Sequence, residues 1–185
     1  MAITISANTN TISGLAVGGL PDGCVDTDTL ANAAVTEPKR GADGILQHVI
    51  HNGNGQQTTN SNSFTNVGNA QISITTKRAG SKILVQFRFG TETNGSINGI
   101  HWQISRDKPS TDTIIYNSGQ DSHWETNNWT GIGTTFLQYK DTHGQTAGTE
   151  ITYKVRWKVE STDNTAYINM GNTDGAIQVF AWEIA

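Results

Sequence analysis

The chain has 185 residues and a formal net charge of −4, with 12 Lys and Arg against 16 Asp and Glu. Because no basic surplus is present to neutralise a phosphate backbone, nucleic acid is not expected as a partner. Only 15% of the residues are charged, against a usual ~25%, and Thr, Asn, Ser, Gln and Gly supply the polarity. These residues favour strands and turns over surface helices, which excludes an all-helical fold.

Cys24 is the only cysteine, so a disulfide framework and a cysteine-based zinc site within one chain are both excluded. Residues 1–8 lack the basic stretch and the apolar core of a secretory signal. No apolar run approaches the ~20 residues needed to span a bilayer. We therefore expect a protein that does not insert into a membrane and is made in a reducing cytoplasm. We expect it to reach the outside of the cell by a route such as lysis.

Residues 1–43 have the pattern of an extended arm. Residues 2–7 alternate as a short strand does, residues 14–25 are rich in Gly, and residues 28–35 fit two helical turns. The arm has no aromatic residue and its apolar residues are scattered singly, so it is too poor in apolar surface to build a core alone. A strand this short is expected to gain stability by pairing with another chain or sheet.

Residues 44–185 have the pattern of a regular series of strands separated by turn signals such as 67–69, 79–81 and 106–109. This spacing, with one apolar side to each strand, predicts an all-β antiparallel sandwich of Greek-key or jelly-roll type. The expected strands are 45–50, 71–75, 82–89, 99–106, 113–116, 132–139, 150–159, 166–170 and 177–184.

Three tryptophans, Trp102, Trp157 and Trp182, lie on alternating strand faces with other apolar residues and are expected in the core or at a subunit interface. His101, Gln103 and Ser105 are expected on the polar side of their strand. His143, which precedes Gly144, has the setting of a turn residue.

The stretch 117–130 is the most distinctive and is expected to be a polar loop. In an extended conformation Asp121, His123 and Glu125 point the same way, so they are candidates for metal ligation or acid–base chemistry. The alternative is a solvated polar loop, and no distant ligating element completes a metal site. We therefore expect no metal and no cofactor.

Two tryptophans of the same stretch, Trp124 and Trp129, offer flat apolar faces and an N–H group, a combination suited to sugars. The alternative is that they cap the sandwich or fill a subunit seam. With Asn128, Asp121, His123 and Glu125 they form the candidate receptor-binding set. The chain carries no nucleophile elbow, no phosphate-binding glycine loop and no zinc-protease motif, so no enzyme is expected.

Five segments resemble a known family when taken in order: 18–36, 44–50, 73–85, 152–155 and 181–184. The first is similar to an N-terminal connector. Residues 44–50 resemble a first distal strand, residues 73–85 a strand–turn–strand unit, and the remaining two the last strands. Together the chain resembles small tail-fibre and fibre-tip proteins of marine and freshwater phages, including cyanophages.

The resemblance implies a homotrimer located in the virion. Its arm, residues 1–43, would attach to tail, baseplate or capsid proteins, and its distal domain, residues 44–185, would bind a host-surface glycan. The rival functions are a trimeric capsid decoration protein, a lectin-like module and a polysaccharide-degrading enzyme. The apolar residues assigned to virion attachment are Ile3, Ile5, Leu15, Leu20 and Leu30.

Overall fold

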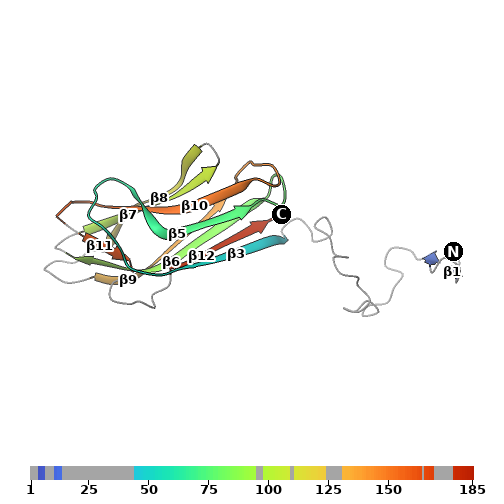
Figure 1. The fold of residues 1–185 in the computed structure, drawn as a ribbon, viewed down its shortest axis with the longest axis horizontal. Helices are drawn as coiled ribbons and strands as arrows, with labels where there is room; N and C mark the ends of the chain where they lie inside the picture. The colour runs from blue at the N-terminus through green and yellow to red at the C-terminus, as the bar shows by residue number, and fades with distance from the viewer. Residues whose placement is uncertain are drawn as a thin grey trace. The chain divides into compact units, whose positions relative to one another are not determined.

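The computed structural model describes residues 4–6, 11–13, 44–94, 98–108, 111–123, 131–163, 165–168 and 177–185 (Figure 1). The chain divides into two compact units, Met1–Arg40 and Gly41–Ala185. In the second unit two antiparallel sheets pack face to face around one core, which confirms the predicted all-β sandwich.

The first unit contains a short antiparallel pair, β1 (Thr4–Ser6) and β2 (Thr11–Ser13). Ile5 lies opposite Ile12 in this pair. The predicted strand at residues 2–7 is therefore present, but its partner is a second Thr-Ile-Ser segment of the same chain rather than another chain or sheet.

The larger sheet of the second unit has six strands. The long strand β6 pairs with β9 along one flank, and with β12 and then β11 along the other. β3 extends the row beyond β12, and β4 extends it beyond β11. The strands are β3 (Ile45–Gly53), β4 (Gln57–Thr59), β6 (Lys82–Asn94), β9 (Gly131–Asp141), β11 (Thr165–Ile168) and β12 (Ile177–Ile184).

The smaller sheet has four strands in the order β5-β10-β7-β8, and it forms the second layer of the sandwich (Figure 1). The strands are β5 (Thr65–Thr75), β7 (Asn98–Lys108), β8 (Thr111–His123) and β10 (Glu150–Val159).

The strand pairing is nested. β3 pairs with β12, β5 with β10, β6 with β9 and β7 with β8. This is the pattern of one long hairpin, and rolling it up adds the pairs β12–β6 and β10–β7. A two-sheet fold wound in this way is a jelly roll, as the strand pattern predicted.

The core lies between the two sheets and is built from the inward side of every long strand. The indole rings of Trp102 and Trp157 stack with centroids 5.8 Å apart, and Phe89 lies 5.1 Å from Trp102. Both tryptophans are almost fully buried, so they belong to the core, one of the two places predicted for them.

Three local expectations are wrong. Residues 67–69 do not break the chain, because β5 runs through them and absorbs the extra residues as a bulge opposite Lys154 and Arg156. β8 continues to His123, so residues 117–123 are strand rather than loop. Gln103 and Ser105, expected on an open polar side, are buried.

Candidate functional site

The predicted receptor-binding residues fall at the end of β8 and in the stretch that follows it. The backbone of Asp121 pairs with Ile100, and that of His123 pairs with Asn98. Trp124, Glu125, Asn128 and Trp129 lie outside the described residues. This stretch joins β8 of the smaller sheet to β9 of the larger sheet.

Of the five residues predicted for virion attachment, Ile5 lies in β1. Ile3, Leu15, Leu20 and Leu30 lie outside the described residues. Their role stays a prediction.

The described surface has one feature that the sequence analysis did not single out, an apolar patch on the outer side of the larger sheet. In β12 the residues Val179 and Ala181 point into the core, so Phe180 and Trp182 point outward. Cross-strand partners share a side, and the register therefore extends the patch onto β3, β6 and β9. We call this patch the apolar face; it comprises Ile45, Ile50, Leu84, Phe136, Phe180, Trp182 and Ile184.

The apolar face is open to solvent. Ile45 and Phe136 are each 56% exposed and Ile50 is 53% exposed. The rings of Phe180 and Trp182 stack on each other with centroids 5.4 Å apart. Trp182, expected in the core or at an interface, is therefore not a core residue.

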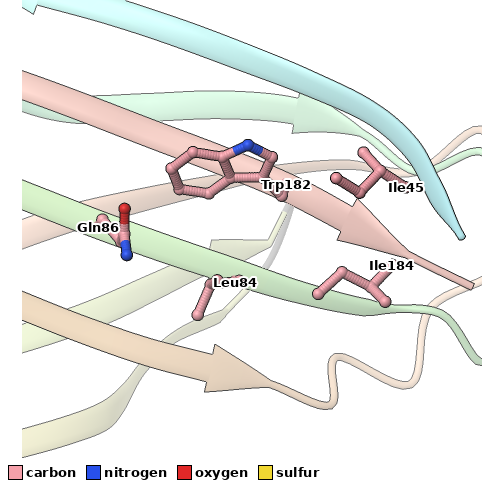
Figure 2. A pocket seen from close by; sticks show the side chains of 5 residues that line it. All are labelled: Ile45, Leu84, Gln86, Trp182 and Ile184. Atoms are coloured by element: carbon pink, nitrogen blue, oxygen red, sulfur yellow. The ribbon is translucent and has the colours of Figure 1, made fainter. Parts of the chain in front are cut away.

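One part of the apolar face is hollowed. Figure 2 shows the Trp182 indole on β12 beside Ile45, with Leu84 and Gln86 on the neighbouring strand β6 and Ile184 at the end of β12. The hollow has a volume of about 220 Å³. That is below the roughly 300–1,000 Å³ of small-molecule sites, so the face is suited to a broad contact rather than an enclosed ligand.

Cations flank the apolar face. Lys82, Arg88 and Lys140 are exposed, and the register places them on the same outer side, with Arg88 directly opposite Phe136. Within the described part of the chain none of the three forms an ion pair with a carboxylate. Gln86 and Gln138, also on this side, hydrogen-bond to each other at 2.8 Å.

Two polar clusters, by contrast, are buried at one end of the sandwich. Glu183 occupies an inward position of β12 and is fully buried. Its carboxylate accepts hydrogen bonds from the backbone N–H groups of Lys77 and Arg78 at 2.9 and 3.0 Å. The Ser81 hydroxyl and the Gln47 amide each lie 2.6 Å from it. Burial raises the pKa of Glu183, but these donors outweigh burial and lower it below its ordinary value.

Ser81, His143 and Glu183 together have the composition of a nucleophile, a base and an acid. Their hydrogen bonds, however, do not run in the directions that a catalytic triad requires. The backbone N–H of Gln145 donates to Nδ1 of His143 at 2.9 Å, so the ring proton sits on Nε2 and is donated to the Ser81 oxygen at 3.2 Å. Burial lowers the pKa of His143, which keeps the ring neutral. A histidine that donates to the serine cannot act as its base, and Ser81 and His143 are buried.

A second buried cluster lies at the same end of the sandwich. Nη1 of Arg106 donates to both oxygens of Asp141 at 2.7 and 2.9 Å, and the Tyr153 hydroxyl donates to the same carboxylate at 2.8 Å. Burial raises the pKa of the Tyr153 hydroxyl. His143, expected to be a turn residue, lies in the loop beside this cluster and is buried.

Within the described residues no group of three or more His, Cys, Asp or Glu side chains is arranged to hold a metal ion. A search of that same part of the chain finds no helix with the length and apolarity to cross a membrane.

No protein-family model matches the chain, and no curated protein matches it. Some solved structures are similar to parts of the chain at low identity and low TM-score. Latent PorU from Porphyromonas gingivalis is 8% identical with a TM-score of 0.43, over 75% of this chain and 12% of PorU. The infectious bursal disease virus Gx strain structure is 9% identical with a TM-score of 0.33, over 76% of this chain and 37% of the viral one.

A CBM4 structure is 7% identical with a TM-score of 0.26, over 62% of this chain and 89% of that chain. Because these TM-scores lie below 0.5, the likenesses carry no argument about fold or activity. The phage-fibre resemblance of the sequence stays a prediction.

Sequence reasoning missed both the apolar face and the Glu183 cluster, although β12 carries a signal for each. Ile177, Val179 and Ala181 define the inward side, and Glu183 continues their period of two, which marks a carboxylate directed into the core. Phe180 and Trp182 occupy the alternate positions, so the strand is apolar on both sides. A strand of that kind at a sheet surface predicts a second contact on its outer side.

Proposed function

We propose that the chain is a non-enzymatic structural protein of a bacteriophage virion, a short homotrimeric tail fibre that binds a glycan on the host surface. Residues 1–43 attach to tail or baseplate proteins. The jelly roll of residues 44–185 faces the host.

The observation that carries this proposal is the contrast, among the described residues of 44–185, between the apolar face and the buried polar clusters. The apolar face is open, whereas the carboxylate, serine and histidine groups lie inside and are bonded to one another. This contrast supports a protein that acts through surface contacts, as fibre subunits do, because the buried Ser81, His143 and Glu183 groups have no access to substrate.

The jelly roll also supports the proposed host contact. The stretch with Trp124 and Trp129 follows β8 of one sheet and precedes β9 of the other, and we expect it to be a loop; loops on a rigid scaffold are where binding residues concentrate. Three copies of such a loop in one fibre raise avidity for a repetitive surface glycan without any new contact.

A glycan array tests the proposal directly. The full chain is expected to retain surface polysaccharides, and the variant with both Trp124→Ala and Trp129→Ala is expected to lose at least ten-fold in affinity, because each aromatic contact is worth ~1 kcal/mol. The variant should keep the wild-type unfolding midpoint, which controls for misfolding. Retention of no glycan by the wild type contradicts the host-binding role, and shortening of a retained glycan contradicts the non-enzymatic one.

A further inference from the structure

We infer that the apolar face is the surface through which one copy of this chain contacts the next copy in a closed ring. The inference rests on the proposed homotrimer and adds the surface that builds it. The occupant is a second copy of this chain rather than a sugar or another ligand.

The size of the apolar face fits a subunit contact. Three side chains that are more than half exposed and four that are partly exposed leave on the order of 500 Å² of apolar surface. A stable protein–protein contact buries roughly 800 Å² on each partner, with an apolar centre and a polar rim. The apolar face supplies such a centre, and Lys82, Arg88 and Lys140 supply part of the rim.

The chemistry of the face favours protein over sugar. Ile45 and Ile50 are branched aliphatic side chains that offer no partner to a sugar hydroxyl. The amides of Gln86 and Gln138 spend part of their hydrogen-bonding capacity on each other, and His48, opposite Trp182, is the other polar side chain beside the ring. Trp182 is only partly exposed and is stacked on Phe180, so it does not present an isolated flat ring. Apolar and aromatic side chains of another protein match this surface better.

The charges favour a ring over a symmetric pair. A two-fold contact of the face with itself would bring together two surfaces that each carry Lys82, Arg88 and Lys140, and this juxtaposition of like charge is unfavourable. A head-to-tail contact instead sets the face against a different surface. Exposed carboxylates lie away from the face on the described body, among them Asp112, Glu150 and Asp163. Such carboxylates on a neighbouring copy can meet the three cations in a head-to-tail contact, and a head-to-tail contact that closes forms a ring.

The experiment compares two identical substitutions on the full chain by light scattering on a sizing column. Ile50→Glu places a carboxylate in the apolar face, and Ile114→Glu is the matched control, since Ile114 is 40% exposed on β8 of the other sheet. We expect Ile114→Glu to keep the trimer mass and Ile50→Glu to run as a folded monomer, with the association constant reduced at least 100-fold. Phe136→Lys, which sets a cation opposite Arg88, is a second variant with the same expected result should Ile50→Glu fail to fold.

The outcomes separate the two proposals. A wild-type monomer at every concentration overturns the homotrimer and the inference with it. A wild-type trimer that persists in the folded Ile50→Glu or Phe136→Lys variant overturns the inference alone. A variant that stays trimeric but loses glycan binding also overturns the inference, because the face would then be a sugar site. A wild-type mass of two chains overturns the ring.

Discussion

Glu183 shows at the scale of one residue how the fold tolerates a buried charge. A carboxylate inside a sandwich is costly unless its oxygens are saturated with donors. Here two backbone N–H groups of the β5–β6 turn, the Ser81 hydroxyl and the Gln47 amide supply those donors. The side chain therefore ties the end of β12 to the turn that precedes β6. Its inward position could be predicted from the alternation of β12. The hydrogen-bond partners of Glu183 could not be predicted, because the β5–β6 turn comes close to Glu183 only when the ends of the two sheets meet in the folded chain.

Glu183→Gln is expected to lower the free energy of unfolding by ~2–3 kcal/mol, because an amide replaces the charge and sets an NH₂ group against existing donors. The matched control is Glu150→Gln, in which the same change is made at an exposed position of β10 and stability is unchanged. Urea unfolding of the two variants is the measurement. Equal stability of both would show that the cluster does not hold the β5–β6 turn.

His143 and Glu183 give stability a two-step dependence on pH. Burial lowers the pKa of His143 below its ordinary value of 6.5, so the unfolded chain takes up this proton first as the pH falls below 6.5. The donors around Glu183 lower its pKa below 4.5, so its contribution is complete above pH 4.5 and is lost below it. Unfolding midpoints in urea should fall modestly below pH 6.5 and more steeply below pH 4.5. In the His143→Gln variant the decline of the unfolding midpoint below pH 6.5 should vanish. If that decline persists, it arises from another titratable group.

At the scale of elements, the strands with a strict period of two were predictable and the irregular ones were not. β10 alternates without interruption, and its inward residues Tyr153, Val155 and Trp157 are buried as expected. Residues 67–69 carry turn chemistry, yet the strand continues through them as a bulge. The position of a bulge depends on pairing with the partner strand, and the sequence of one segment does not reveal that pairing. The same holds for residues 117–123, whose polar composition hides their pairing with β7.

The bulged part of β5 also explains why residue 53 is a glycine. A Cβ on Gly53, at the end of β3, would lie 2.6 Å from the backbone oxygen of Asn69. Gly53→Ala is therefore expected to destabilise by about 1–3 kcal/mol, because neither backbone can give way cheaply. Gly68→Ala is the control, since its Cβ would meet the flexible end of the Gln57 side chain at 2.9 Å. Thermal unfolding of the pair checks this, and a Gly53→Ala variant as stable as Gly68→Ala would contradict the close approach.

At the scale of the whole molecule, the sequence predicted two sheets and a jelly roll but not which strands pair. The decisive pairs are distant ones: the first long strand β3 with the last strand β12, and β5 with β10. Such pairing depends on packing of the complete core, not on local propensity. The apolar face is a product of the same assembly, because it joins outward positions of β3, β12, β6 and β9 that are separate in sequence.

The mass of the wild-type chain in solution, measured by light scattering on a sizing column, tests the central claim most directly. A ring of three chains of 19.9 kDa predicts about 60 kDa. That result would agree with a fibre subunit whose exposed apolar face is covered by its neighbours. A stable, soluble monomer of 19.9 kDa at all concentrations would contradict both the trimer and the covered face.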